Sequence, residues 1–298
     1  MRLAAELVSQ PESTIDTDIY MELIERCAFV SNDSDFMFKL GLSQPLSDLG
    51  LAGQALVSAS TAAETFDLLD MLLKYLQSQS SVEITRRGNR SQIRYGNWHH
   101  DDWASRLDVK YSVGIITNIL LQLEYASEPD ITIYSPLANG GPFRRGNLEI
   151  MSVSSTTGTI EFNTDAVCPA IPAVSSERFE ILQRFFSANT PVDLMSMDFT
   201  TTTTELIRSG FAVAPVSEPG IATLFGTSTR TLKRRLQAEG TTYRDILRDV
   251  RKTIAVEELA AGRNITEIAL KLGYDHPQNF TTAFQKWFGT NPSAYRKI

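Results

Sequence analysis

The segment Ile221-Ala-Thr-Leu-Phe-Gly226 recurs 47 positions later as Ile268-Ala-Leu-Lys-Leu-Gly273. In each copy an apolar residue and an alanine stand one helical turn before an apolar residue and a glycine. An alanine lets a second helix cross closely, and a glycine lets the backbone turn where a Cβ would clash. A segment of helical period follows each copy, at Thr229 to Ala238 and at Gln278 to Phe288. This pattern predicts two helix-turn-helix units.

The residues between the two units predict one helix from Tyr243 to Ala261. Its apolar residues recur at helical spacing, and Gly262 follows where a left-handed cap would place it. At about 1.5 Å per residue, this helix is a rod of roughly 28 Å. Major-groove faces on one side of B-DNA repeat every ~34 Å. Such a helix would set two recognition helices in adjacent grooves, so that one polypeptide would read both without dimerising.

Charge is distributed unevenly along the chain. The 298 residues carry a formal net charge of −7, which alone argues against a nucleic-acid partner. From Thr200 onward there are 14 Lys and Arg against 9 Asp and Glu, a net charge of +5, whereas the preceding residues carry −12. This asymmetry indicates a basic binding module attached to an acidic domain. A charge of +5 is common for a segment of this length, so it permits DNA binding without proving it.

The composition is that of a soluble globular protein, with 42% hydrophobic and 21% charged residues, and the length allows two domains. Met1 to Ser13 lacks the apolar core of a signal peptide. The longest apolar run, Val113 to Leu123, is too short to span a bilayer. Cys27 and Cys168 form neither a disulfide framework nor a metal cluster. We therefore expect a cytoplasmic protein with no membrane partner.

The N-terminal region predicts a mixture of helices and strands. Helices are expected at Asp16 to Cys27, Thr61 to Gln77, Trp103 to Tyr125 and Ser176 to Phe186. Two strands, Val82 to Arg87 and Arg90 to Trp98, form a hairpin through Gly88-Asn89, and further strands are expected at Ile131 to Tyr134 and Thr159 to Phe162. The glycine- and proline-punctuated stretch Ser31 to Gly53 is expected to be rich in loops.

The fold class that follows is α+β. A mixed α/β regulatory domain is expected over residues 1–190 and a linker over 191–204. An all-α domain of two helix-turn-helix units, joined by a linker helix, is expected over 205–298.

The C-terminal residues resemble a known family. Val216 to Ile298 is similar to the DNA-binding domain of the AraC/XylS family of bacterial transcription regulators. The resemblance is carried in the first unit by Gly226 to Leu236 and Glu239-Gly240, and in the second by Ile268-Ala269, Gly273-Tyr274, Phe280, Phe284, Trp287-Phe288-Gly289 and Pro292 to Arg296. Gly226 to Leu232 spans six positions but Gly273 to Phe280 spans seven, so the second turn is expected to be one residue longer.

The N-terminal residues carry a second resemblance. Gly41 to Leu56, followed by Thr61 to Tyr75, is similar to the arabinose-binding-like domain of regulators of the ornithine- and arginine-utilisation type. The resemblance implies a domain that senses an effector or mediates self-association. Leu137 to Gly158 shows little of the family pattern. The effector itself is not indicated, because the effectors of this subgroup are varied.

In the first recognition helix, Leu232 and Leu236 must face a core. This orientation turns outward Thr229, Arg230, Lys233 and Arg234. Arg can contact guanine through two hydrogen bonds or hold a phosphate, and Lys can hold a phosphate. The resemblance places base reading at Arg230 and Arg234, with Thr231 and Lys233 nearby. The alternative interpretation is a solvated basic face.

In the second recognition helix, an inward aromatic stripe of Phe280, Phe284 and Phe288 is expected. The residues left near the groove are Gln278, Asn279, Thr281 and Thr282. Gln and Asn can read adenine, but Thr282 stands where many relatives have an arginine. We therefore expect this unit to position phosphates more than to read bases. Lys286 either contacts the DNA backbone or is an exposed lysine without a role, and His276 is expected to be a turn residue.

One stretch offers potential metal ligands, His99-His100-Asp101-Asp102. Consecutive residues of an extended loop point to opposite sides, however, and the next histidine is the distant His276. The sequence contains no Gly-x-Ser-x-Gly elbow, phosphate-binding glycine-rich loop or Cys-x-x-Cys pair. It therefore predicts no enzyme, no catalytic or metal-binding residues and no cofactor.

The favoured function is a sequence-specific DNA-binding transcription regulator, an effector-responsive activator with two recognition helices in successive major grooves. Its expected partners are double-stranded promoter DNA, RNA polymerase if it activates, a small-molecule effector and a second copy of the chain in a homodimer. The alternative is a structural DNA-binding protein with an N-terminal protein-interaction domain and no effector. Ligand-dependent promoter binding would separate the two.

Overall fold

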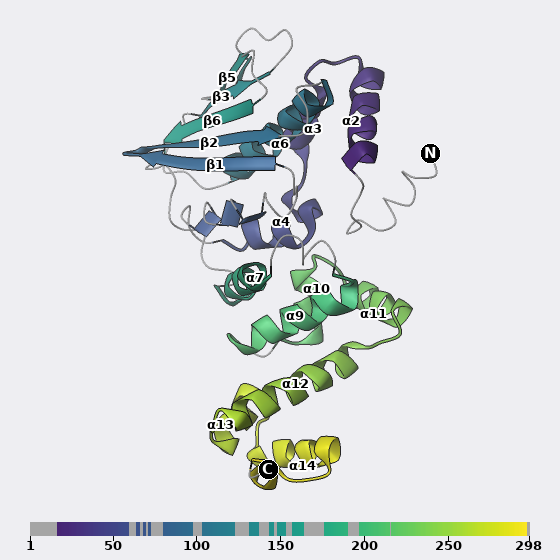
Figure 1. Cartoon of the computed structure of the whole chain (residues 1–298). Coiled ribbons are helices and arrows are strands. Elements are labelled where there is room, and N and C mark those ends of the chain that lie inside the picture. Colours follow the sequence, from purple (N-terminus) through teal and green to yellow (C-terminus); the bar gives the residue numbers. More distant parts are fainter. Residues whose placement is uncertain are drawn as a thin grey trace. The chain divides into compact units, whose positions relative to one another are not determined.

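The computed structural model describes residues 17–296 apart from 60–63, 66–67, 70, 73–79, 98–102, 123–130, 137–142, 146–147, 153–156, 164–175, 190–196 and 215. The chain forms two compact units, Met1–Ser176 and Glu177–Ile298 (Figure 1). In the described ranges, every helix is too short or too polar to cross a membrane.

The first unit is built on a mixed sheet. In the described residues its strands lie in the order β1-β2-β6-β3-β5-β4. Only β3 and β5 run parallel, and the other neighbours are antiparallel. The strands are β1 Ser80–Arg87, β2 Arg90–Asn97, β3 Ile131–Ser135, β4 Phe143–Arg145, β5 Leu148–Ser152 and β6 Thr157–Asn163. Buried and half-buried residues alternate along β3 and β6, as expected for a sheet with one face on the core.

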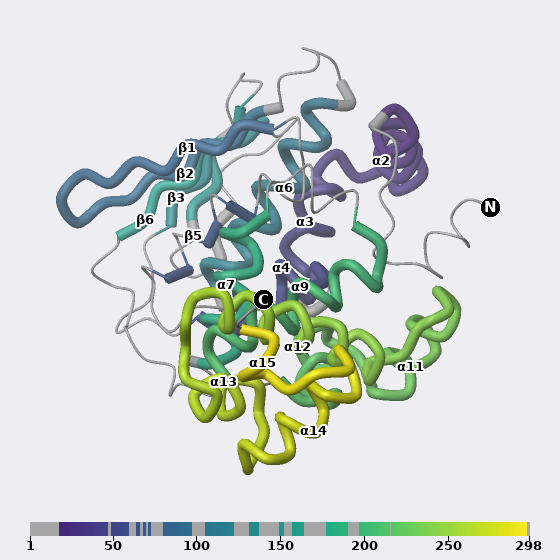
Figure 2. Tube along the Cα trace, turned by 60° about the horizontal axis from the view of Figure 1, so that its bottom comes forward, coloured from purple at the N-terminus to yellow at the C-terminus, as the bar shows by residue number. Residues whose placement is uncertain are grey.

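Three helices form the layers over this sheet. The long helix α6 (Trp103–Gln122) packs against β2, β3 and β6, and its Val109, Val113 and Ile116 are fully buried. Helices α2 (Thr17–Ser31) and α3 (Phe36–Ser43) pack on α6 in turn (Figure 1, Figure 2).

The expectation of a loop-rich stretch from Ser31 to Gly53 is wrong. This stretch contains α3, the 3₁₀ helix η1 (Leu46–Leu49) and the start of α4 (Gly50–Leu56). Its glycines mostly permit close packing. A Cβ on Gly41 would lie 2.2 Å from the Tyr111 carbonyl oxygen, and one on Gly53 would lie 1.6 Å from the Leu46 carbonyl oxygen. Among the described glycines of this stretch, Gly50 has a positive φ, of 58°, which glycine adopts without steric cost.

Gly41→Ala is expected to destabilise the first unit, because the new methyl group would meet the α6 backbone. Overpacking of this kind costs about 1–3 kcal/mol, or more where backbone must move. The free energy of unfolding in urea measures the effect. Ser43→Ala, at an exposed position of the same helix, is the matched control and should change stability by less than about 0.5 kcal/mol. Equal stability of the two variants would contradict the proposed tight crossing of α3 and α6.

The other sequence predictions for this unit are confirmed within the described residues. The hairpin of β1 and β2 turns at Gly88, with φ of 61°. The remaining confirmed elements are α2, α6 up to Gln122, β3 and β6. The helix expected at Thr61 to Gln77 is present at 64–65, 68–69 and 71–72, where Leu68, Leu69 and Leu72 are buried.

The sequence did not predict every element of this unit, and some of its predictions concern residues outside the described ranges. The strands β4 and β5 were not predicted; they lie in the segment that shows little family pattern. The His99 to Asp102 stretch and the first three residues of the helix expected at Thr61 to Gln77 lie outside the described residues. Among the described residues, no three His, Cys, Asp or Glu side chains are grouped so that they could hold a metal ion.

The second unit is helical in its described residues. Its helices are α7 (Ser176–Ala188), α9 (Phe199–Phe211), α10 (Glu218–Leu224), α11 (Thr229–Ala238), α12 (Tyr243–Ala260), α13 (Ile265–Lys271), α14 (Pro277–Phe288) and α15 (Pro292–Tyr295). Helix α9 packs against α10, α11 and α12, and α13 packs against α12 and α14. The compact units divide after Ser176, whereas the sequence interpretation ended the first domain at residue 190.

Helix α9 begins inside the segment 191–204 that was expected to be a linker. Asp198 caps it by accepting a 2.7 Å hydrogen bond from the Thr201 N–H. The following threonines have low helix propensity. Their hydroxyls nevertheless bond within the helix, as Thr203 does to the Phe199 carbonyl at 2.7 Å and Thr204 to the Thr200 carbonyl at 2.8 Å. The cap and these bonds explain why a threonine run is helical here.

Candidate nucleic-acid interface

The first helix-turn-helix unit consists of α10 and α11. Helix α10 ends in a Schellman cap, in which the Gly226 N–H donates to Thr223 O and the Thr227 N–H donates to Ala222 O, both at 2.9 Å. Gly226 has a φ of 62°, so the glycine is required for the turn. Ala222 is 2% exposed. The roles predicted for the alanine and the glycine are thus confirmed.

The second unit, α13 and α14, repeats this geometry. The Gly273 N–H donates to Leu270 O and the Tyr274 N–H donates to Ala269 O, again at 2.9 Å, and Gly273 has a φ of 73°. Residues 225–228 separate the helices of the first unit, and residues 272–276 separate those of the second. The second turn is therefore one residue longer, as predicted.

Helix α12 connects the two units and ends one residue before the predicted position. Its 18 residues correspond to about 27 Å at 1.5 Å per residue. Thr242 caps its start: the Thr242 hydroxyl oxygen accepts from the Asp245 N–H, and the hydroxyl donates to the Asp245 carboxylate at 2.6 Å. This hydroxyl lowers the pKa of Asp245. At the other end, Gly262 has a φ of 77°, which confirms the left-handed cap.

On α11, the expected inward and outward residues are confirmed. Leu232 and Leu236 are fully buried. The exposed residues are Arg230, Lys233 and Arg234, and Thr229 and Thr231 are half-buried. Neither Arg230 nor Arg234 has a hydrogen-bond or ion-pair partner among the described residues. Four positions apart, these two arginines lie on one face of the helix.

Two other candidates on α11 have partners within the unit. The Lys233 ammonium lies 3.4 Å from a carboxylate oxygen of Glu218, in the first turn of α10. Such exposed pairs contribute little to stability, about 0–1 kcal/mol, so Lys233 can exchange this partner for a phosphate. The Thr231 hydroxyl oxygen lies 3.1 Å from that of Ser228, the helix cap. Thr231 is therefore part of the cap of α11.

On α14, Phe280 and Phe284 are fully buried and Phe288 is half-buried, with its ring 4.6 Å from that of Phe284. The exposed candidates are Gln278, Asn279, Thr282 and Lys286, and Thr281 is half-buried. The Thr281 hydroxyl donates to Pro277 O at 3.0 Å, and the Thr282 hydroxyl donates to Gln278 O at 2.9 Å. Both threonine hydroxyls therefore use their protons within the helix. His276 is the residue before α14, as predicted for a turn position.

Two family models match the chain. A model described as a helix-turn-helix domain matches residues 221–298, and the model of the N-terminal arabinose-binding domain of the AraC transcription regulator matches residues 1–124. The chain thus resembles AraC-type regulators in both of these parts. The second model covers α2, α3, α4, β1, β2 and the whole of α6, and the first covers α10 from Ile221 onward and all of α11 to α15.

Several relatives of this chain are named as transcription regulators. It is 47% identical to the ornithine utilization regulator of Pseudomonas aeruginosa over 72 residues, which are 24% of this chain and 21% of that protein. It is 36% identical to the regulator VirS of Mycobacterium tuberculosis over 92 residues, which are 30% of this chain and 27% of that protein. The alignments thus span between a fifth and about a quarter of the length of these relatives.

Among solved structures, the chain is similar to the transcriptional regulator CdpR from Pseudomonas aeruginosa. The two share 19% sequence identity with a TM-score of 0.38, over 96% of this chain and 100% of that one.

Thr282→Ala is expected to change DNA affinity by less than about 0.5 kcal/mol, because the Thr282 hydroxyl donates to the backbone of its own helix. Fluorescence anisotropy with a labelled operator measures the affinity. Gln278→Ala, at a neighbouring exposed amide that is able to read adenine, serves as the comparison. If Thr282→Ala weakened DNA binding as much as alanine substitution of Arg234 on α11 does, the two units would share base reading equally.

Sequence reasoning assigned no role to Arg251 on α12. Its guanidinium carbon lies 4.7 Å from the centre of the Tyr274 ring, in the turn of the second unit. Its Nε atom is buried and lacks a hydrogen-bond partner among the described residues. The signal in the sequence that could have identified it is a basic residue at a position of α12 that the helical period makes half-buried. The contact joins the connecting helix α12 to the second helix-turn-helix unit.

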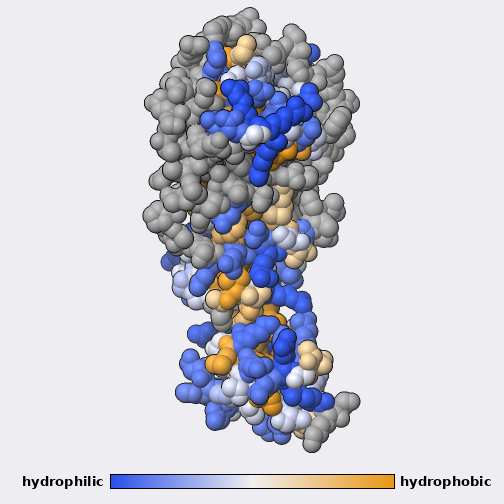
Figure 3. Space-filling model, turned by 90° about the vertical axis from the view of Figure 1, so that its left-hand side faces the viewer, coloured by the Kyte–Doolittle hydropathy of each residue, from blue (hydrophilic) through white to orange (hydrophobic). Residues whose placement is uncertain are grey.

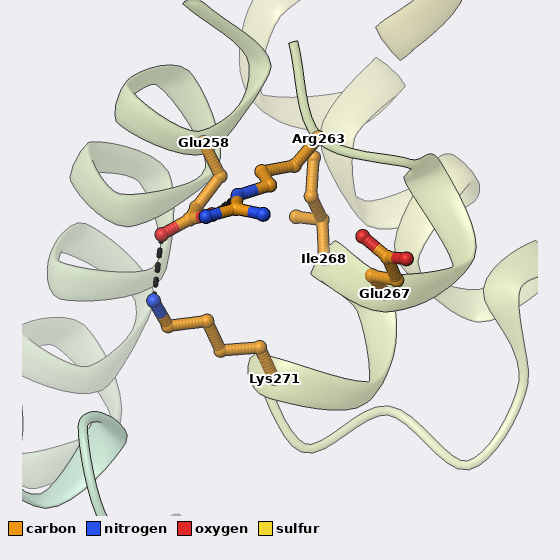
Figure 4. Close-up of a pocket in the computed structure, with 5 residues that line it drawn as sticks. All are labelled: Glu258, Arg263, Glu267, Ile268 and Lys271. Carbon is orange, nitrogen blue, oxygen red and sulfur yellow. Dashed lines mark hydrogen bonds and ion pairs between the residues drawn. The ribbon is translucent and has the colours of Figure 1, made fainter. Parts of the chain in front are cut away.

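The cavity of about 320 Å³ beside α13 has a charged lining of Glu258, Arg263, Glu267 and Lys271 around Ile268 (Figure 4). The Lys271 ammonium lies 2.6 Å from the Glu258 carboxylate, and the Arg263 Nε lies 3.9 Å from it. Small-molecule sites are usually mostly apolar with few polar groups. Glu258 pairs with both cations, and the largely charged lining does not suit a small-molecule effector.

The face of the molecule in Figure 3 shows hydrophilic residues over most of the described surface, with hydrophobic areas between them. In the second unit, α12 contributes charges that pair along the helix. Arg248 lies 2.8 Å from Asp245 and 3.2 Å from Asp249, and Lys252 lies 3.3 Å from Asp249. The bond from Arg248 lowers the pKa of Asp249. These paired cations are less available for phosphate than the arginines of α11.

Proposed function

We propose that this chain is a sequence-specific DNA-binding transcription regulator that inserts α11 and α14 into successive major grooves. The observation that carries the proposal is the pair Arg230 and Arg234, which are exposed on one face of a recognition helix and have no partner among the described residues. Free guanidinium groups on a helix of this kind fit the edge of guanine or a phosphate. The two matching units on one connecting helix support the proposed spacing.

The two units have unequal tasks in this proposal. Helix α11 supplies most of the base selectivity through Arg230 and Arg234, with Thr229, Thr231 and Lys233 beside them. Helix α14 positions the DNA backbone through Lys286 and the polar residues Gln278, Asn279, Thr281 and Thr282. The threonine hydroxyls that donate to the α14 backbone support this division.

The N-terminal region, residues 1–190 in our proposal, regulates DNA binding. The match to an arabinose-binding domain supports a small-molecule effector. We further propose an activator that acts in the cytoplasm, contacts RNA polymerase and forms a homodimer, and that has no enzymatic activity. The ornithine utilization regulator among its relatives makes L-ornithine a first candidate effector, and L-arabinose a second.

Footprinting of the full chain on the DNA that flanks its own gene tests the proposal. Two protected segments about 10 base pairs apart are expected, with an affinity that falls steeply as salt rises. Protection that changes with L-ornithine or L-arabinose would identify an effector. Binding with no preferred site would favour the structural DNA-binding protein, and absence of binding would overturn both functions.

A further inference from the structure

The carboxylate of Glu239 joins the end of the first recognition helix to the start of α9. Glu239 directly follows α11 and accepts hydrogen bonds from the Thr200 N–H at 2.7 Å and the Phe199 N–H at 3.2 Å. It also accepts from the Thr200 hydroxyl at 2.5 Å. The first N–H groups of a helix have no partner within the helix, and an anion is favoured at this end. Glu239 therefore caps α9 from another element.

An aromatic contact joins the same parts of the unit. The Phe199 ring lies 4.5 Å from the ring of Phe225, the first residue of the turn between α10 and α11. The Arg235 guanidinium lies 5.2 Å from the centre of the Phe199 ring. A guanidinium over an aromatic ring is attracted to the negative face of the ring. Phe199 thus contacts the turn that precedes α11 and a side chain of α11 itself.

These contacts define the rotation of α11 about its axis. Arg235 and Glu239 lie four residues apart, so they share one face of the recognition helix, and that face is turned toward α9. Arg234 directly precedes Arg235, so its side chain points about 100° away from that of Arg235 around the helix axis. A small rotation of α11 that broke the bonds of Glu239 would move Arg230 and Arg234 relative to the groove.

We propose that Glu239 and Phe199 are positioning residues for the first recognition helix. The first turn of α9 holds α11 at the angle at which its arginines meet the bases. No contact of this set involves α13 or α14, so the effect is confined to the half-site that α11 reads. The inference rests on the proposed function.

The test uses the full chain with Glu239→Gln, a variant that removes the charge but keeps the size of the side chain. Titration footprinting gives the protection of each half-site separately, and the half-site weakened by Arg234→Ala is assigned to α11. We expect Glu239→Gln to weaken protection of that half-site by roughly tenfold, since a hydrogen bond to a charged group has about this effect on an equilibrium constant. Protection of the other half-site should change less than about twofold.

Glu257→Gln is the matched control. This exposed carboxylate also joins α9 to another element, because the Arg208 side chain of α9 lies 2.6 Å from it. Glu257 lies on α12 and not on α11, however, so neither half-site should weaken. Phe199→Leu is the second variant and should give the same half-site pattern as Glu239→Gln, which keeps a readout if the first variant folds poorly.

The outcomes separate the inference from the proposed function. A wild-type chain that protects no discrete site would overturn the proposed function. A wild-type chain that protects two half-sites, both weakened equally by Glu239→Gln and Phe199→Leu, would show a general loss of stability and overturn the positioning role. Unchanged protection in both variants would overturn it as well.

Discussion

Phe284→Ala is expected to destabilise the second helix-turn-helix unit by about 3–5 kcal/mol, the usual cost of truncating a buried phenylalanine. The Phe284 side chain is fully buried. Its ring centre lies 5.7 Å from that of Phe280, 4.6 Å from Phe288 and 5.3 Å from Tyr295. The side chain therefore joins both ends of α14 to α15, and its removal leaves a cavity among rings that cannot close together.

Native-state hydrogen exchange measures this loss locally, because two compact units need not unfold together. Amides of α14 should exchange much faster in Phe284→Ala, whereas those of α6 should not change. Leu270→Ala is the matched control, since this apolar side chain of α13 is 59% exposed and its loss should cost less than about 0.5 kcal/mol. Protection of α14 that stays within 1 kcal/mol of the wild type, roughly fivefold, would show that Phe284 is not central to the core.

The two helix-turn-helix units could be predicted from sequence because their signals are local. A glycine with positive φ, a small residue one turn earlier and a cap act within a few residues of one another, so they are visible as a motif. The predicted Thr229 to Ala238 matches α11, and the predicted Gln278 to Phe288 begins one residue late. Helix α9 was not predicted because a threonine run has low helix propensity. Its cap, Glu239, also lies 40 residues from Phe199 in the sequence.

In the first unit, the glycines were misinterpreted because their partners are distant in sequence. Gly41 lies against Gly114 of α6, with 3.1 Å between the Cβ that would replace a hydrogen of Gly41 and the Gly114 Cα. A glycine that serves such a helix crossing has the same appearance in the sequence as one that serves a turn. Only long-range packing distinguishes the two.

The sequence predicts which side chains of the candidate site face outward, but not which ion pairs and hydrogen bonds they form. Burial of Leu232 and Leu236 fixes which residues of α11 face outward, and this follows from helical period alone. The ion pair of Lys233 with Glu218 depends on the angle between α10 and α11. The bond of the Thr282 hydroxyl to the α14 backbone depends on its rotamer. Neither is encoded in a local pattern.

Arg234→Ala is expected to weaken specific DNA binding by roughly 1–3 kcal/mol, the value for an arginine that reads a base. The side chain is exposed and has no partner among the described residues, so its removal should not alter folding. The loss should therefore be a loss of binding, with relaxed preference at one base pair. Anisotropy titrations against operators substituted at each position measure both quantities.

Arg87→Ala separates this contact from a general effect of charge. Arg87 is exposed at the end of β1, in the first unit, and its removal changes the net charge by the same amount. It should leave affinity and base preference unchanged. Arg234→Ala could instead weaken binding to all DNA sequences equally and reduce the slope of log binding constant against log salt concentration by about one. In that case the arginine holds a phosphate. Base reading by the first unit would then depend on Arg230, because it is the other exposed arginine on the same face of α11.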